Sequence, residues 1–194
     1  MAPAVELPGE KELIESAQRG SVDAFEKLVF HYQDRLLRFL LVKAPTRPDA
    51  EDALQDTFAA AFRYLASYKS RYRFSTWLFT IAIRELCKTG RSQTEPLERP
   101  ASVVCQQAGP EQLGIRSQTW QSIWKTARAC LSESQFTAMW LYYAEDLPQK
   151  EIAAAMKRPV SWVKVNLMRG RRSLLRELRE EETEYSVSHK EVTL

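Results

Sequence analysis

Apolar residues recur at steps of three and four positions along most of the chain, and no run of strand-like alternation interrupts them. This period predicts a succession of amphipathic helices, because a helix returns to the same face every 3.6 residues. Pro45 and Pro48 bound the end of the first long helix, since proline cannot continue a helix and restricts the residue before it. Its expected apolar stripe is Ala24, Phe25, Leu28, Val29, Tyr32, Leu36, Phe39 and Leu40.

Two more helices are predicted before residue 89. Asp49 is expected to be the N-cap of the next one, with Glu51 and Asp52 in the first turn, where acidic side chains are favourable. Its expected buried stripe is Leu54, Phe58, Ala61, Phe62 and Leu65. A polar loop at residues 67–74 then leads to a third helix. The residues expected to face inward there are Trp77, Leu78, Ile81, Ala82 and Leu86.

The helical period fails at about residues 89–114, where three prolines and three glycines lie among polar residues. That composition is typical of a linker, and so long a structureless stretch is uncommon inside one compact domain. We therefore expect an all-α protein with two small helical domains, 10–88 and 111–179, joined by a flexible linker at 89–110. Residues 180–194 are polar and are expected to form a disordered tail.

The second domain carries its own helix signals. A helix with Leu113, Trp120, Ile123, Trp124 and Ala127 on one face is expected first. Ser132 and Gln135 then match a capping box, which begins a helix through Phe136, Met139, Trp140 and Tyr143. A short helix at 149–156, a break at 157–159 and a helix led by Ser161 follow. This layout is that of a helix-turn-helix, whose second helix lies in the major groove of DNA.

The charge distribution indicates nucleic acid as a partner. The whole chain has a net charge of +3, yet residues 157–179 hold eight basic residues and one acidic residue, Glu177, for a local net charge of +7. Such a stripe attracts phosphates and releases counterions. The loop before the third helix interleaves rings with cations, a combination that suits unpaired bases. Its members are Tyr64, Tyr68, Lys69, Arg71, Tyr72, Arg73, Phe74 and Trp77.

Composition argues against an enzyme, a metal centre and a membrane protein. The chain has two histidines and six glycines, and it lacks HExxH, GxGxxG and GxxxxGK[ST] motifs. Cys87, Cys105 and Cys130 form no CxxC pair, which fits a reducing compartment. No apolar run approaches the roughly 20 residues of a membrane span, and no secretion signal is visible. We expect a cytoplasmic, non-catalytic protein without metal or cofactor.

Taken together, the motifs of both domains resemble those of bacterial RNA polymerase sigma factors of the extracytoplasmic-function (ECF) group, in the sigma-70 family. In the first domain the matching segments are Asp49-Ala50-Glu51-Asp52-Ala53-Leu54-Gln55-Asp56-Thr57-Phe58 and Phe74-Ser75-Thr76-Trp77-Leu78-Phe79-Thr80-Ile81-Ala82. In the second they are Leu131-Ser132-Glu133, Glu151-Ile152-Ala153 and Val163-Lys164, with Arg169 and Arg171. The resemblance implies a region 2 domain at 10–88, a region 4 domain at 111–179, and promoter-specific transcription initiation.

The resemblance also assigns roles to particular residues. Asp52, Gln55 and Asp56 are expected to dock on the clamp helices of the polymerase largest subunit, and region 4 on the beta flap. The residues expected at the melted −10 strand are Lys69, Arg71, Tyr72, Arg73, Trp77, Arg84 and Lys88. Those expected at the −35 duplex are Ser161, Trp162, Lys164, Val165, Asn166, Arg169 and Arg171. An anti-sigma factor is implied as a further partner, and no membrane insertion.

The chain departs from the family pattern at three of its basic residues. Many relatives carry Asn at the position of Arg84 and Asp at that of Lys88, which leaves the −10 preference open. The usual turn glycine of the helix-turn-helix is Lys157.

Other functions remain open at this stage. A stand-alone, dimeric helix-turn-helix regulator explains residues 131–179 but leaves the 49–58 helix and the aromatic, cationic loop without a role. A small helical interaction protein, whose charges only keep it soluble, is a third alternative. Redox sensing through Cys87 or Cys105 is a fourth.

Overall fold

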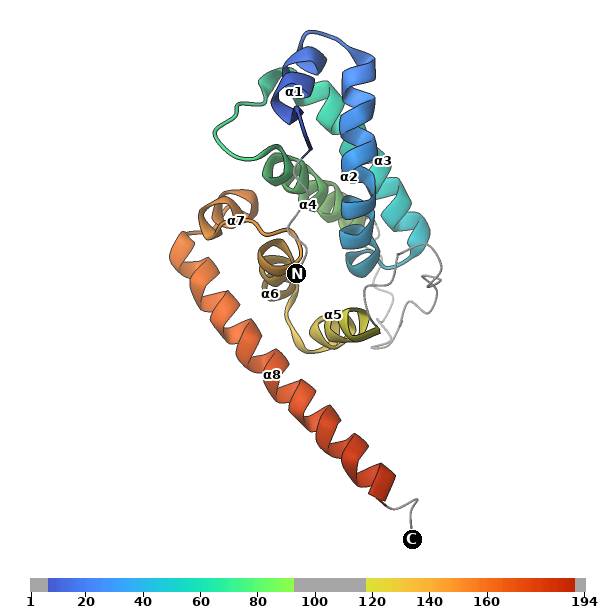
Figure 1. Ribbon diagram of the computed structural model, residues 1–194, viewed down its shortest axis with the longest axis vertical. Coiled ribbons are helices and arrows are strands. Elements are labelled where there is room, and N and C mark those ends of the chain that lie inside the picture. Colours follow the sequence, from blue (N-terminus) through green and yellow to red (C-terminus); the bar gives the residue numbers. More distant parts are fainter. Residues whose placement is uncertain (1–6, 93–117, 191–194) are drawn as a thin grey trace. The chain divides into compact units, whose positions relative to one another are not determined.

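The computed structural model describes residues 7–92 and 118–190 (Figure 1). Within those ranges the chain is helical, with eight α-helices, one short 3-10 helix and no strand. Contacts divide the chain into two compact units, residues 1–108 and 109–194. The predicted all-α, two-part architecture is therefore confirmed. No helix in the described ranges is both long enough and apolar enough to cross a bilayer.

The first unit is built around its long second helix. Its elements are α1 (Glu10–Gln18), α2 (Val22–Lys43), α3 (Arg47–Tyr64), the 3-10 helix η1 (Leu65–Ser67) and α4 (Phe74–Ser92). On α2, Leu36 and Phe39 have no exposed surface, and the Phe39 ring meets that of Phe79 on α4 edge-on at 5.4 Å. Each fully buried side chain of this size contributes about 1.5–3 kcal/mol to folding. The predicted α2 stripe is buried except for Val29, which is half-buried.

Helix α3 begins earlier than its sequence pattern predicted. Thr46 is the N-cap, and its hydroxyl accepts the Asp49 N–H at 3.3 Å. Asp49 therefore lies in the first turn and is not the cap. Pro48 is accommodated in that turn because a proline N–H is not needed there.

The predicted buried stripe of α3 was also wrong in part. The helix buries mainly small residues, namely Ala50, Ala53, Thr57, Ala60 and Ala61, whereas Leu65 in η1 is buried as expected. Leu54 and Phe58 are half-buried, and Phe62 is 50% exposed. On α4, Trp77 and Leu86 are likewise half-buried and not fully inward.

The second unit contains α5 (Gln118–Cys130), α6 (Glu133–Tyr143), α7 (Gln149–Met156) and α8 (Val160–Lys190). Its core is aromatic: the Trp124 ring lies 4.7 Å from that of Trp140 and 5.4 Å from that of Phe136. Gly170 lets α8 approach α6, because a Cβ there would lie 3.2 Å from Cγ of Met139. Leu113, which was predicted to share one face with Trp120 and Trp124, lies outside the described residues.

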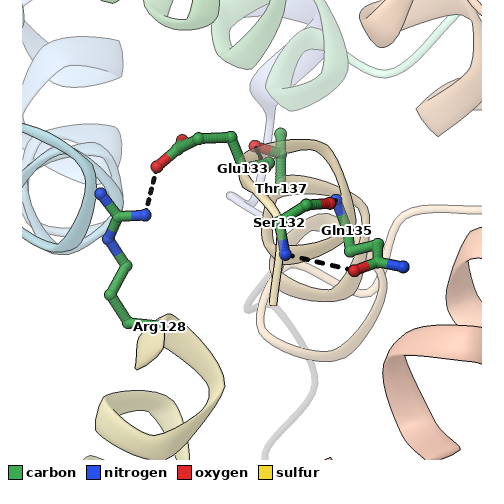
Figure 2. Close-up of polar contacts among 5 residues, drawn as sticks. All are labelled: Arg128, Ser132, Glu133, Gln135 and Thr137. Carbon is green, nitrogen blue, oxygen red and sulfur yellow. Dashed lines mark hydrogen bonds and ion pairs between the residues drawn. The ribbon is translucent and has the colours of Figure 1, made fainter. Parts of the chain in front are cut away.

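The predicted capping box at the start of α6 is confirmed. Ser132 Oγ accepts the Gln135 N–H at 3.3 Å, and the Gln135 side chain accepts the Ser132 N–H at 3.2 Å (Figure 2). Figure 2 also shows Arg128, at the end of α5, reaching the carboxylate of Glu133 as an ion pair. These bonds fix the α5–α6 corner.

Two predicted boundaries differ from the structure. Helix α8 continues to Lys190, so the segment expected to be a disordered tail from residue 180 is helical as far as 190. The chain has no proline or glycine after Gly170, and it is rich there in Glu and Arg, which favour helix. Helix α4 similarly extends to Ser92, into the predicted linker, whose remaining residues lie outside the described ranges.

Candidate nucleic-acid interface

Helices α7 and α8 form a tight helix-turn-helix. The buried Ile152 of α7 and the buried Val163 and Leu167 of α8 hold the two helices together. Helix α7 ends at Met156 and is capped by Lys157, whose φ of 51° and ψ of 46° are left-handed. The Arg158 N–H then donates to the Ala153 carbonyl at 2.9 Å, which closes the turn.

One face of α8 presents a continuous exposed stripe. Val163 and Leu167 occupy the opposite, buried side. The exposed positions follow the helical repeat from the N-terminal end, and we call them the α8 stripe: Ser161, Lys164, Val165, Met168, Arg169 and Arg172. Three cations and a hydroxyl thus share one surface with two apolar side chains, a composition that suits phosphates and base edges together.

Three of the residues predicted at the −35 duplex lie beside this stripe. The Asn166 side-chain amide donates to the Trp162 carbonyl at 2.9 Å. Arg171 Nε donates to the Leu167 carbonyl at 3.3 Å. Trp162 is half-buried, with the Arg158 guanidinium 5.5 Å from its ring centroid.

Sequence reasoning omitted two members of the stripe from the predicted site, Met168 and Arg172. The signal was available, because Arg172 lies eight residues after Lys164 and Met168 seven after Ser161. Such spacings return to the same helical face.

The segment between η1 and α4, residues 68–73, forms what we call the basic loop. It is anchored by rings: Tyr68 lies 5.4 Å from Phe74 and 5.3 Å from Trp77 between ring centroids. The Tyr68 hydroxyl also donates to the Tyr72 carbonyl at 2.9 Å. The side chain of Tyr68, the first residue of the basic loop, therefore also holds the far end of the loop, at Tyr72 and Phe74.

The basic loop places its cations in solvent. Lys69, Arg71 and Arg73 are exposed, and Tyr72 is half-buried with the Arg71 guanidinium 5.6 Å from its ring centroid. Phe74, next along the chain, is 2% exposed and belongs to the core. Charge and a partly accessible ring are thus brought together on one short segment.

The remaining residues predicted at the −10 strand lie along one face of α4. Trp77, Arg84 and Lys88 are separated by seven and four residues, so they project from the same side of the helix. Arg84 is exposed, whereas the Lys88 ammonium is paired with the Glu85 carboxylate at 2.7 Å. The charge of Lys88 is consequently partly neutralised within the helix.

Helix α3 presents a third surface. Asp52, Gln55 and Asp56 are all exposed at spacings of three and four, on one helical face. Phe62 lies seven residues after Gln55, on the same side of the helix as Gln55, and its ring contacts Phe25 edge-on at 5.0 Å while half of the residue remains in solvent. Sequence reasoning placed Phe62 in the core and so missed it as a surface residue.

Burial raises the pKa of Tyr32, and the hydrogen bond from its hydroxyl to Glu10 raises it further. The described residues contain no cluster of His, Cys, Asp and Glu suited to a metal ion. Cys130 is a half-buried thiol, while the side chain of Cys87 and all of Cys105 lie outside what the structure describes.

Comparison with known proteins assigns a family to this arrangement. The Sigma-70 region 2 family matches residues 28–95, and the Sigma-70 region 4 family matches residues 125–174. The RNA polymerase sigma-H factor of Pseudomonas aeruginosa is 28% identical over 182 residues, covering 85% of this chain and 91% of the relative. The ECF RNA polymerase sigma-E factor of Escherichia coli K12 is 29% identical over 174 residues, covering 84% and 90%.

Two solved structures share the fold. One is CnrH in complex with the cytosolic domain of CnrY, with a TM-score of 0.65 at 21% identity over 89% of this chain and 98% of that one. The other is the sigma factor RpoE of Bartonella quintana in complex with the anti-sigma factor NepR, with a TM-score of 0.65 at 23% identity over 81% and 98%. Because the region 2 family matches the first unit and the region 4 family matches the second, the alternative of a stand-alone helix-turn-helix regulator is disfavoured. The chain belongs to the ECF group of the sigma-70 family, and it directs promoter-specific transcription initiation.

Proposed function

We propose that three surfaces of this chain each make one of the binding contacts of a sigma factor. The α8 stripe reads the −35 duplex, the basic loop with one face of α4 holds the melted −10 strand, and the exposed face of α3 docks on core RNA polymerase. The observation that carries the proposal is the α8 stripe, since a basic, exposed face on the second helix of a helix-turn-helix has the position and chemistry of a major-groove reader.

Within the stripe, Arg169 is the best candidate for direct base reading. It is exposed two turns from the start of α8, and arginine paired bidentately with guanine is the commonest specific contact in the major groove. Lys164 and Arg172 suit phosphates. Asn166 and Arg171, which bond to backbone carbonyls of their own helix, are better placed to support this face than to lead its contacts.

Replacing Arg169 tests this assignment. Arg169→Ala is expected to weaken binding to the specific duplex by about 1–3 kcal/mol and to relax preference at one base pair. Arg172→Ala is expected to weaken all duplexes alike and to reduce the salt dependence. Lys125→Ala, an exposed cation on α5, is the matched control. Unchanged promoter choice in the Arg169 variant would contradict the assignment.

The basic loop suits an unpaired strand. Stacking on an aromatic ring is worth about 1–3 kcal/mol per base, which can offset the few kcal/mol needed to take a base out of the duplex. Tyr72 and Trp77 are half-buried and so offer ring surface, with Lys69, Arg71 and Arg73 nearby for phosphates. Arg71→Ala and Tyr72→Ala are expected to weaken binding of the −10 single strand, measured by fluorescence anisotropy with the holoenzyme. Equal affinity in both variants would refute this role.

The α3 face offers carboxylates and an amide to a charged protein partner. Gln55→Ala combined with Asp56→Ala is expected to reduce affinity for core polymerase without unfolding the chain, because both side chains are exposed. Gln33→Ala combined with Asp34→Ala provides a matched control, since α2 carries the same Gln-Asp pair, with Asp34 exposed and Gln33 half-buried. If both double variants compete equally well for core polymerase, α3 is not the docking helix.

The remaining partners follow from the family. We infer that the second unit also contacts the polymerase beta flap and that an anti-sigma factor binds the free protein, as CnrY and NepR bind the two structural neighbours. The proposed location is the cytoplasm, and the proposed role is non-catalytic. Co-elution with core polymerase, followed by transcription of fragmented genomic DNA, tests the whole assignment. Discrete new start sites are expected, whereas duplex binding without a polymerase complex would favour the stand-alone regulator.

A further inference from the structure

Helix α1 is joined to the basic loop by one side chain. The Gln18 Nε2 donates two hydrogen bonds, to the carbonyls of Leu65 and Tyr68, both at 3.0 Å. These acceptors lie 47 and 50 residues away in sequence. Figure 1 shows α1 against the turn that follows α3, where η1 leads into the loop. Because both N–H groups of the Gln18 amide are hydrogen-bonded, this side chain fixes the position at which the basic loop begins.

The second carbonyl belongs to the residue that organises the loop. Tyr68 packs its ring on Phe74 and Trp77 and donates its hydroxyl to the Tyr72 carbonyl. A continuous set of contacts therefore runs from α1 to Tyr72 and to the first turn of α4. The exposed cations Lys69, Arg71 and Arg73 lie on this segment or at its end.

The opposite end of α1 is attached to the core beneath the loop. Glu10 accepts a hydrogen bond from the Tyr32 hydroxyl, and the Tyr32 ring lies 5.6 Å from that of Phe74. Helix α1 is thus fixed to the body of the unit at its first residue and to the loop at its last. Gln18 therefore connects a helix that is fixed to the core with a segment that has little regular structure of its own.

We propose that Gln18 is a positioning residue for promoter melting: it holds the basic loop in its strand-binding form before DNA arrives. The inference rests on the proposed role of the basic loop at the −10 strand. Ordering a loop costs conformational entropy, and contacts that order it in the free protein remove that cost from the binding step. Loss of Gln18 then weakens capture of the single strand and leaves the other two surfaces intact.

The test compares Gln18→Ala and Gln18→Glu with Lys11→Ala, an exposed α1 variant that removes only the surface pair with Glu15. The probe is a fluorescein-labelled, single-stranded oligonucleotide with the −10 non-template sequence of a promoter that the holoenzyme transcribes. Loss of two hydrogen bonds predicts about tenfold weaker binding for Gln18→Ala. Gln18→Glu is expected to bind more weakly still, because its carboxylate faces two carbonyl oxygens. Lys11→Ala is expected to match the wild type.

A spectroscopic readout separates positioning from general damage. Trp77 is the only tryptophan in the first unit, so 5-fluorotryptophan labelling gives the Tyr68–Trp77 contact its own fluorine resonance, assigned with Trp77→Phe. Gln18→Ala is expected to move or broaden that resonance while those of the second unit stay in place. Tyr68→Phe, which removes the bond to Tyr72, is expected to weaken strand binding in the same direction and to be non-additive with Gln18→Ala.

Affinity for core polymerase serves as the folding control, because it depends on α3 in the same unit. If strand binding and polymerase binding fall together, Gln18 is merely structural and the inference is wrong. If Tyr72→Ala weakens strand binding but Gln18→Ala does not, the inference fails while the role of the loop stands. If neither variant changes strand binding, the proposed role of the basic loop fails first.

Discussion

Lys157 provides a test of how backbone conformation governs the helix-turn-helix. Its φ of 51° and ψ of 46° place a lysine in the left-handed region at the end of α7. The left-handed conformation costs an L-residue roughly 1–2 kcal/mol because Cβ crowds the following carbonyl oxygen, and glycine escapes that cost. The change Lys157→Gly should therefore relieve strain at the turn.

The expected gain is smaller than the strain, because glycine also gains freedom in the unfolded chain. This added freedom of the unfolded chain lowers the free energy of unfolding by about 0.4–1 kcal/mol. The turn hydrogen bonds use only backbone atoms: Lys157 N–H to the Ala154 carbonyl at 3.2 Å, and Arg158 N–H to the Ala153 carbonyl at 2.9 Å. They survive the substitution, and the lysine side chain is exposed. The net expectation is a stabilisation of about 0.5–1 kcal/mol.

Thermal unfolding of the full chain measures this gain. In a Trp77→Phe background the remaining four tryptophans all lie in the second unit, so their fluorescence reports its unfolding alone. For a unit of this size, the expected stabilisation raises Tm by about 2–8 °C. Ala154→Gly, three residues earlier in α7, is the opposite-sign control, with an expected cost of about 0.5–1 kcal/mol. A lower Tm for Lys157→Gly would refute the reasoning.

Three further outcomes follow from the contacts described. Ser132→Ala removes the α6 cap and should destabilise the second unit by about 1 kcal/mol, whereas Ser134→Ala, exposed within the first turn, should change its Tm little. The pKa of Tyr32 is raised above its ordinary value of 10.0 by burial, so the folded state retains a proton that the unfolded chain loses above that pH. Stability of the first unit should therefore fall by about 1.4 kcal/mol per pH unit above pH 10 in urea titrations, and Tyr32→Phe should remove this slope. Ile152 of α7 is fully buried where α7 packs on α8, so Ile152→Ala should lower the free energy of unfolding by about 2–5 kcal/mol in the same assay and abolish duplex binding. Lys150→Ala, at an exposed position of the same helix, should do neither.

Local signals predicted the second unit well because its boundaries are encoded locally. The Ser132–Gln135 capping box and the Pro159 break both act within a few residues, and α7 has the predicted bounds Gln149–Met156. The α8 face was predictable in the same way, from the spacing of its cations. The side-chain bonds of Asn166 and Arg171 to their own helix were not, because the periodicity of a helix does not say which polar side chain turns back to its backbone.

The first unit was harder to predict where tertiary packing overrides hydrophobicity. A pattern reading assigns large apolar residues to the core, yet α3 packs through Ala53, Thr57 and Ala61. Close helix approach favours small side chains there, which the neighbours α2 and α4 impose and the α3 sequence alone does not reveal. The two hydrogen bonds of Gln18 were equally invisible, since each joins segments more than forty residues apart.

The unusual orientation of α3 supports its proposed role as a docking helix. A helix that served only the fold of its own unit would bury its largest apolar residues, because burial of a phenylalanine contributes far more than burial of an alanine. Helix α3 instead buries Ala53 and Ala61 and leaves Phe62 half in solvent, on the same side as Gln55. Exposed aromatic surface beside charged groups is the composition of a protein interface, with an apolar centre and a polar rim. Burial of this ring against a partner would contribute the binding energy that the fold of the unit does not use, so the proposed docking surface includes Phe62 beside the carboxylates.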